Sequence, residues 1–346
     1  MKILVTGGTG FIGSHTVVEM QQNGYEVVIA DNLSNSFENV VDAIQQITGI
    51  RPAFENTDLT DINQTRELFQ KHPGIMGVIH FAAFKAVGES TRMPLKYYHN
   101  NLFSLINLLT VMQENKVNNL VFSSSCTVYG QPDTLPVDES SPVKKALSPY
   151  GNTKQISEEI IGDTVKTSGL NAILLRYFNP IGAHESALIG ELPIGVPDNL
   201  VPYITQTAIG KRPSMCVYGN DYNTPDGTCI RDYIHVVDLS KAHMVALNRL
   251  LKNQNQNSCE VFNLGTGKGY SVLEVIKSFE KISRVKLAYK MAERRPGDVE
   301  KIWADTTLAN EVLGWKAEKD LDEMMLSAWK WEKSYSEKNK NDSIHE

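Results

Sequence analysis

A tyrosine and a lysine four positions apart, Tyr150 and Lys154, could together carry out acid–base chemistry. Ser148 and Pro149 precede them as a hydroxyl N-cap and a proline at the first helical position, so the pair is predicted to lie one turn apart on a helix over 149–168. A free phenol has a pKa of about 10, and a neighbouring ammonium can lower it by roughly 1–3 units. We therefore expect Lys154 to favour the phenolate of Tyr150, which could then accept a proton from a hydroxyl group.

A second group of residues with chemical potential follows the first predicted strand, the apolar residues 2–6. Gly7, Gly10 and Gly13 are spaced for a tight turn that opens a helix. Such a turn lets the backbone approach a pyrophosphate, and the helix N-terminus adds N–H donors and a positive dipole end. Asp31 closes the next predicted strand, where a carboxylate can bind ribose hydroxyls and repel a 2′-phosphate. These features predict a site for NAD rather than NADP.

The elements that must position these residues alternate between strand and helix as far as residue 176. Further strands are predicted at 51–56, 78–82, 120–124 and 172–176, with helices at 61–71, 94–115 and 149–168. We expect an α/β fold, a Rossmann-type doubly wound parallel sheet that binds ligands beyond the carboxyl ends of its strands. The candidates that fall at those ends are Asp58, Phe81-Ala82-Ala83 and Ser123-Ser124-Ser125.

The chain changes in character after Arg176. Residues 177–232 are rich in Gly, Pro and Asn, and the only helix predicted among them lies near 201–209. We expect an NAD-binding domain over 1–176 and a smaller C-terminal substrate-binding α/β domain over 177–333, with some of its segments packing back on the first. A polar, frayed tail is expected over 334–346.

Composition and charge exclude several classes of function. The 346 residues are 41% hydrophobic, which suffices for a large core, and the net charge of −6 without a basic tract argues against nucleic acid as a partner. No apolar run approaches the length of a membrane span, and nothing resembles a signal peptide, so we expect a soluble cytoplasmic protein. The four cysteines are scattered and the histidines show no metal-binding spacing, so no metal is expected.

Eight longer segments carry a resemblance that covers nearly the whole chain. They are LVTGGTGFIGSH (4–15), HFAAFKAVGES (80–90), FSSSCTVYG (122–130), SPYGNTK (148–154), LRYFNPIGAH (175–184), YGNDYNTPDGTCIRDYIHV (218–236), FNLGTG (262–267) and RRPGDV (294–299). Together they resemble the UDP-hexose 4-epimerases of the extended short-chain dehydrogenase/reductase family. The resemblance implies an NAD-dependent isomerase that interconverts UDP-glucose and UDP-galactose through a transient 4-keto sugar and enzyme-bound NADH. It also implies a homodimer that pairs through helices 94–115 and 149–168.

The resemblance also assigns roles to individual residues. Ser125, Tyr150 and Lys154 match the catalytic serine, tyrosine and lysine, which also touch the cofactor, and Ser125 and Tyr150 touch the sugar as well. The other positions assigned to NAD are Gly7, Gly10, Phe11, Ile12, Gly13, Asp31, Asn32, Asn35, Ser36, Asp58, Leu59, Phe81, Ala82, Ala83, Lys85, Asn100 and Phe178. The other positions assigned to the UDP-sugar are Asn179, Asn199, Leu200, Tyr218, Arg231, Arg295, Asp298 and Ile302.

Three features of the substrate side bear on specificity. Arg231 and Arg295 suit a pyrophosphate because guanidinium binds its oxygens in pairs, and surface salt bridges are the alternative. Cys126 and Thr127 stand where dehydratases of the family carry an acidic pair, which argues against a dehydratase. Ile302 stands where some epimerases strict for non-acetylated sugars carry a tyrosine, so we expect some turnover of UDP-N-acetylglucosamine.

Two alternatives to an epimerase stay open. One is another nucleotide-sugar enzyme on the same scaffold, a dehydratase, decarboxylase or net dehydrogenase. The other is a non-catalytic NAD-sensing protein, although such a protein typically loses the tyrosine or the lysine.

Overall fold

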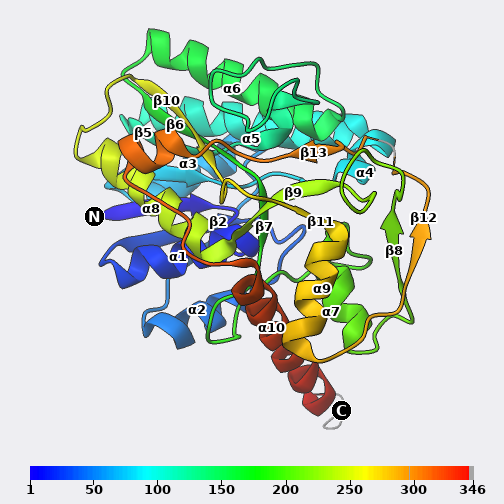
Figure 1. The fold of residues 1–346 in the computed structure, drawn as a ribbon. Helices are drawn as coiled ribbons and strands as arrows, with labels where there is room; N and C mark the ends of the chain where they lie inside the picture. Colours follow the sequence, from blue (N-terminus) through cyan, green and yellow to red (C-terminus); the bar gives the residue numbers. More distant parts are fainter. Residues whose placement is uncertain (296, 343–346) are drawn as a thin grey trace.

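A seven-stranded parallel sheet forms the centre of the structure (Figure 1). The structure, a computed structural model, describes residues 1–295 and 297–342. The strand order is β10-β6-β5-β4-β1-β2-β3, and every neighbouring pair is parallel. The strands are β1 (Lys2–Thr6), β2 (Glu26–Asp31), β3 (Ala53–Asn56), β4 (Ile75–His80), β5 (Asn119–Ser123), β6 (Asn171–Tyr177) and β10 (Cys259–Leu264). This confirms the predicted α/β fold with a doubly wound sheet.

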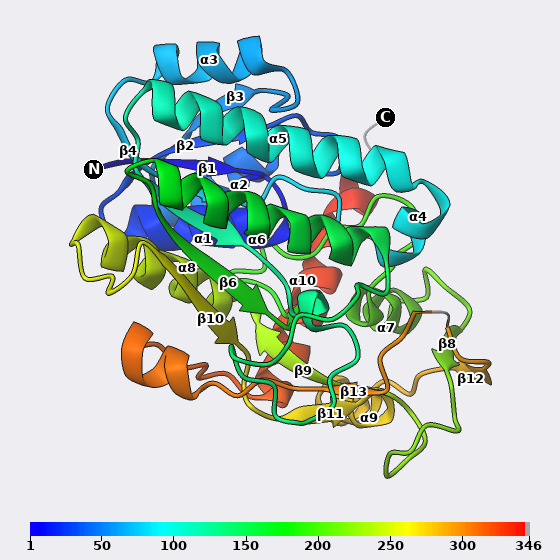
Figure 2. The same cartoon turned by 90° about the horizontal axis from the view of Figure 1, so that it is seen from above.

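Helices cover both faces of this sheet, which is why its inner strands are largely apolar, whereas the edge strand β3 has no buried residue. Ile3 and Val5 pack into one core with α1 (Phe11–Gln22) and α8 (Val236–Leu251), whereas Leu4 points the other way and packs with α5 (Pro94–Glu114). Figure 2 shows α5 and α6 (Pro149–Thr167) side by side along one face. The first face carries α1 (Phe11–Gln22), α2 (Val40–Thr48) and α8 (Val236–Leu251), and the second carries α3 (Ile62–Lys71), α5 (Pro94–Glu114) and α6 (Pro149–Thr167).

The strand order reverses between β1 and β4, which creates a crevice at the carboxyl ends of these two strands. From β1 the chain moves outward to β2 and β3, and it then returns past β1 to β4, β5 and β6. The glycine turn follows β1, and the segment from Phe81 to the short helix α4 (Val87–Arg92) follows β4. Ligands of open α/β sheets bind at such a switch point.

A smaller unit has its own core and its own short strands. Ile204, Phe279 and Met325 are buried at the centre of this unit, where α7 (Leu200–Ala208), α9 (Val272–Ser283) and α10 (Leu321–Asp342) meet. Figure 1 shows these three helices grouped away from the helices of the large sheet. The elements are α7 (Leu200–Ala208), α9 (Val272–Ser283), α10 (Leu321–Asp342), a sheet of β7 (Asn179–Ile181), β9 (Ile230–His235), β11 (Gly269–Ser271) and β13 (Lys301–Ile302), and a pair of β8 (Met215–Tyr218) and β12 (Tyr289–Ala292).

The path of the chain between the two units is more intertwined than a boundary at residue 176 suggests. Both α8 and β10 come from the second half of the chain, yet they pack on the large sheet. The division into domains therefore stays a prediction, with α8 and β10 as segments that return to the first domain. Within 1–295 and 297–342, no helix has both the length and the apolar character needed to cross a membrane.

The C-terminal segment differs from the expected frayed tail. Helix α10 continues through residue 334 to Asp342, while residues 343–346 lie outside the described part of the chain. The reason is that its inward positions are packed: Ser336 is buried and donates a hydrogen bond to Glu332 at 3.3 Å, and Tyr335 lies against Trp331 with 5.4 Å between ring centroids. The composition of this segment is largely polar, so the sequence did not indicate that one narrow face of the helix is packed.

Candidate active site

A cavity of about 1450 Å³ opens at the switch point between the large sheet and the smaller unit. It is larger than the roughly 300–1,000 Å³ typical of a pocket for one small ligand, so it has room for more than one. The structure brings the sequence-predicted site residues together on its walls, namely Gly7, Gly10, Phe11, Ile12, Gly13, Asp31, Asn32, Asn35, Ser36, Asp58, Leu59, Phe81, Ala82, Ala83, Lys85, Asn100, Ser125, Tyr150, Lys154, Phe178, Asn179, Asn199, Leu200, Tyr218, Arg231, Arg295, Asp298 and Ile302.

The glycine turn has no room for side chains. Gly7 has a φ of +70°, and a Cβ on it would lie 2.8 Å from the backbone nitrogen of Ala82. A Cβ on Gly13 would lie 2.1 Å from the Gly7 carbonyl oxygen. These contacts fold the turn closely against the start of α1, so its backbone amides can meet a pyrophosphate. The turn therefore fits a dinucleotide.

Asp31, at the end of β2, is a buried carboxylate held beside this turn. It accepts hydrogen bonds from the Thr9 amide at 3.2 Å, the Leu33 amide at 3.0 Å and the Ser36 hydroxyl at 3.1 Å. These donors fix both oxygens at the edge of the cavity. A carboxylate in this position suits the hydroxyls of an adenosine ribose.

Tyr150 and Lys154 lie at the beginning of α6, as the sequence predicts. The Ser148 hydroxyl accepts a hydrogen bond from the Gly151 amide at 3.1 Å, and Pro149 is the first helical residue. Both side chains of the pair are buried and line the cavity. The Lys154 ammonium donates a hydrogen bond to the Ser123 carbonyl at 2.6 Å, which ties α6 to the end of β5. Ser125 lines the same wall, at the start of a short 3-10 helix (Cys126–Tyr129).

The acidity of the pair differs from the expectation. Burial raises the pKa of Tyr150 above that of a free phenol, Tyr177 adds to the shift, and Ser125 opposes it. Burial also lowers the pKa of Lys154 to about 8, against the opposing effect of Glu158. The pKa of Tyr150 is thus raised in this structure rather than lowered as expected, because loss of solvent is the largest influence on the phenol.

A buried ion pair behind Lys154 was not anticipated from the sequence. The Arg176 guanidinium donates to both carboxylate oxygens of Glu158, at 2.9 and 2.6 Å, and Ser124 donates to the same carboxylate at 2.5 Å. Glu158 lies one turn after Lys154 on α6, so this spacing was the available clue. The ion pair links α6, β6 and the end of β5 behind the wall that carries Tyr150 and Lys154.

The opposite wall is formed by charged side chains of the smaller unit. Arg295 Nη2 lies 2.8 Å and Arg231 Nη2 lies 3.7 Å from Asp298 Oδ1, so the two guanidinium groups converge on a single carboxylate. Tyr218, at the end of β8, lies beside Arg295 at 5.9 Å from ring centroid to guanidinium carbon. Two convergent cations at the edge of a cavity can hold an anionic group.

Cys126 and Ile302 lie between the two walls and restrict the reactions that the cavity can support. Burial raises the pKa of the Cys126 thiol to about 12, so this side chain packs as a small apolar group. Ile302 on β13 is buried beside Cys126 and Phe178. In the described part of the chain, no group of three His, Cys, Asp or Glu side chains is arranged to hold a metal ion.

The parallel sheet, the glycine turn and the buried Tyr-Lys pair define an enzyme of the Rossmann class that acts with a dinucleotide. Residues 4–327 match the model of the GDP-mannose 4,6 dehydratase family. A UDP-glucose 4-epimerase of Drosophila melanogaster is 50% identical over 337 residues, which cover 95% of this chain and 96% of that protein.

Solved structures agree with this relationship. The UDP-glucose 4-epimerase of Stenotrophomonas maltophila, with bound NAD and formylated UDP-arabinopyranose, has a TM-score of 0.94 and 48% identity, covering 98% of this chain and 99% of that chain. The epimerase of Bifidobacterium longum, in complex with NAD+ and UDP, has a TM-score of 0.93 and 44% identity, covering 97% and 99%. The chain belongs to the UDP-glucose 4-epimerase family.

Proposed function

We propose that the chain is a cytoplasmic isomerase that interconverts UDP-glucose and UDP-galactose with bound NAD. The observation that carries the proposal is the convergence of the glycine turn, the Tyr150–Lys154 pair and the two arginines on one cavity. The family relationship supports the same reaction, since related structures hold NAD together with UDP or a UDP-sugar.

The residues of the sheet wall supply the proton chemistry. Tyr150 accepts the proton of the sugar 4-hydroxyl, and Ser125 donates a hydrogen bond to that oxygen as it becomes a ketone. Lys154 holds the ribose of the cofactor and keeps a positive charge beside the phenol at neutral pH. NAD bound beside Tyr150 and Lys154 would supply an acceptor for the C4 hydride of the sugar and a donor for its return to the other face, and its positive ring would add to the charge that favours the phenolate.

The residues of the other wall hold the substrate by its nucleotide. Arg231 and Arg295 exchange part of their interaction with Asp298 for the pyrophosphate. Asn179, Asn199, Leu200 and Tyr218 complete the contacts with the UDP-sugar. Because the nucleotide carries the binding energy, the sugar ring is free to turn and to present either face for reduction.

A dehydratase reaction would need a proton-donating acid beside Ser125, and the residues at that position do not provide one. Elimination of water needs a group that protonates the departing hydroxyl, and Cys126 and Thr127 supply no carboxyl group beside Ser125. The pKa of about 12 for the Cys126 thiol also argues against it as a proton donor. The nearby carboxylate of Glu158 is occupied by Arg176 and Ser124.

The decisive experiment mixes purified protein with UDP-galactose and no added NAD, and follows the anomeric protons by NMR. Appearance of UDP-glucose up to a constant ratio supports the proposal. Loss of UDP-galactose to a dehydrated or decarboxylated product would identify another enzyme of the scaffold, and an unchanged spectrum would favour an NAD-sensing protein.

We also propose that two copies pair through α5 and α6. Leu95, Phe103 and Ile106 recur on the outward face of α5, and Leu95 is 81% exposed. Contact with the same face of a second copy would cover these side chains, as in a four-helix interface. Phe103→Glu should convert the dimer to a monomer in light scattering, whereas a monomeric wild-type protein would contradict the proposal.

The position of Ile302 extends the proposed substrate range. Its side chain is buried in a small apolar cluster and also lines the cavity, where a larger side chain would take up space beside the sugar. We therefore include UDP-N-acetylglucosamine among the substrates. Absence of UDP-N-acetylgalactosamine after long incubation with protein active on UDP-galactose would rule this out.

A further inference from the structure

Glu191 connects two side chains that the sequence assigns to different ligands. Its Oε1 accepts a hydrogen bond from Lys85 Nζ at 2.9 Å and another from the Asn199 side-chain amide at 2.5 Å. Lys85 was assigned to NAD and Asn199 to the UDP-sugar, while Glu191 was assigned to neither. The Glu191 side chain is only 12% exposed, compared with 53% for Lys85, so the carboxylate is the fixed member of the pair.

The backbone of Glu191 is anchored to the smaller unit. Gly190 packs against the indole ring of Trp331 on α10, where a Cβ would come within 2.5 Å of the ring. Trp331 Nε1 donates a hydrogen bond to the Glu191 carbonyl at 3.2 Å, and the His184 amide donates to the Ile189 carbonyl at 3.2 Å, which closes the preceding loop. The carboxylate is therefore presented by a constrained segment of the chain.

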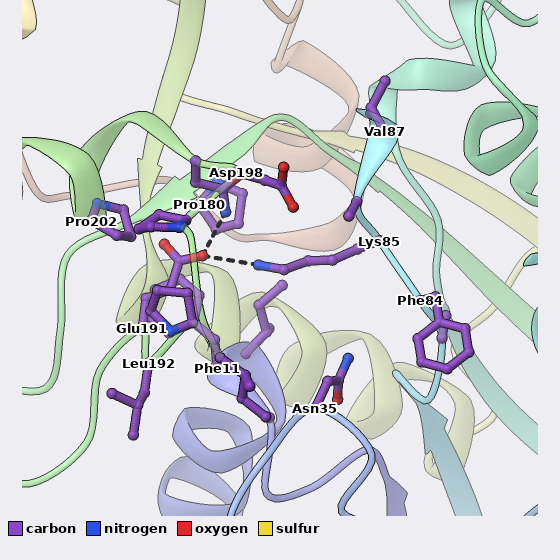
Figure 3. A pocket seen from close by; sticks show the side chains of 18 of the residues that line it. Phe11, Asn35, Phe84, Lys85, Val87, Pro180, Glu191, Leu192, Asp198 and Pro202 are labelled. Carbon is purple, nitrogen blue, oxygen red and sulfur yellow. Dashed lines mark hydrogen bonds and ion pairs between the residues drawn. The ribbon is translucent and has the colours of Figure 1, made fainter. Parts of the chain in front are cut away.

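Lys85 approaches from the opposite wall of the cavity. It follows β4, and its Nζ lies 6.0 Å from the centroid of the Phe11 ring. Phe11 is the first residue of α1, and the pyrophosphate of a dinucleotide binds at this helix N-terminus. Figure 3 shows Lys85 and Glu191 reaching toward each other across the pocket, with Phe11 beside them.

We propose that Glu191 is a positioning residue that holds Lys85 across the cofactor pyrophosphate and couples retention of NAD to occupancy of the UDP-sugar site. This inference rests on the proposed function. A nucleotide bound at Asn199 would act on Lys85 through the Glu191 oxygen that both side chains share. Because coupling between two ligands is reciprocal, bound UDP should slow the release of NAD.

The test measures how fast purified protein releases its NAD, using a second enzyme that captures free NAD+, with and without saturating UDP. The wild-type protein should release NAD more slowly when UDP is present. Glu191→Gln leaves a hydrogen-bonding side chain but removes the charge, so NAD should leave roughly fivefold faster, the scale expected for one ion pair. The effect of UDP on the release rate should disappear in the same variant.

Glu185→Gln is the matched control, because Glu185 is an exposed acid in the same segment. It should release NAD at the wild-type rate and keep the response to UDP. Glu191→Asp retains the charge on a shorter side chain and should restore part of the wild-type behaviour. A merely structural role for Glu191 would change thermal stability without removing the response to UDP.

Glu191→Gln with an unchanged release rate and an unchanged response to UDP would overturn the inference. If this variant fails to fold, Lys85→Met provides the second measurement, and persistence of the UDP effect in it would also overturn the inference. A wild-type protein that holds no NAD, or that does not epimerise UDP-galactose, would instead overturn the proposed function.

Discussion

The two walls of the cavity are built by different means. On the sheet side, a compact backbone turn excludes side chains, and buried hydrogen bonds fix Asp31. On the side of the smaller unit, Arg231 and Arg295 converge on Asp298 from separate segments. A wall defined by backbone geometry should tolerate little substitution, whereas a wall defined by charge should tolerate exchanges that keep the charge. Tyr150 and Lys154 belong to the sheet wall and line the cavity, and only there is proton transfer expected.

The largest effect is expected from Tyr150→Phe, which removes the proton acceptor and little else. Epimerisation should fall by about 10²–10⁴-fold, the contribution typical of a positioned acid or base. Bound NAD, measured by absorbance after denaturation, should stay at the wild-type amount because the glycine turn is untouched. An active variant would refute the role of Tyr150, and loss of NAD would show that the Tyr150 hydroxyl is itself needed to retain the cofactor.

A smaller effect, on NAD affinity, is expected from Gly13→Ala. This substitution tests the sheet wall, where the backbone turn defines the site. The added Cβ would lie 2.1 Å from the Gly7 carbonyl oxygen, so the turn must open. Overpacking of this kind costs about 1–3 kcal/mol, or about 5- to 150-fold in NAD affinity if the binding conformation carries the strain. Titration with NAD followed by calorimetry measures the change.

Gly162→Ala is the control for that substitution. Gly162 lies on α6, and a Cβ there meets nothing within 4 Å. It should leave NAD affinity unchanged and stabilise the protein by about 0.5–1 kcal/mol, because alanine favours helix more than glycine does. Equal affinities for NAD in the two variants would contradict the account of the sheet wall.

Much of the sheet wall was readable from the sequence because local rules determine it. The apolar runs, the glycine spacing and the Ser148-Pro149 cap correspond to β1, the turn and the start of α6. The sequence could not reveal how strongly Tyr150 is desolvated, since its burial depends on distant segments. On the other wall, β11 and β13 have three and two residues, too few for a periodic pattern. Glu191 meets Lys85 across 106 positions, a contact that no local pattern predicts.

The third prediction tests the wall of the smaller unit, where charged side chains define the site. Arg231→Ala should raise the KM for UDP-galactose by about 10- to 100-fold, the range expected for loss of a charged hydrogen bond. Arg231→Lys should recover part of this loss, because the charge remains although the paired geometry is gone. Initial rates over a range of substrate concentrations provide the comparison. If the lysine variant is as impaired as the alanine variant, shape rather than charge defines this wall.

The smallest effect concerns histidines at the contact between the two units. His15 on α1 lies 6.3 Å from His184, measured between ring centroids, and burial lowers the pKa of His15 to about 3 and that of His235 to about 4. Below the ordinary histidine pKa of about 6.5, the unfolded chain binds protons that these buried rings exclude, so stability should fall as the pH decreases toward 4. At pH 5.5 each such histidine should lower the free energy of unfolding by about 1 kcal/mol, which urea unfolding at pH 7.5 and 5.5 measures.

His15→Gln should reduce this loss of stability, whereas His99→Gln, on the exposed side of α5, should not. If stability depends on pH in the same way in the wild-type protein and in both variants, buried His15 does not contribute to this pH dependence.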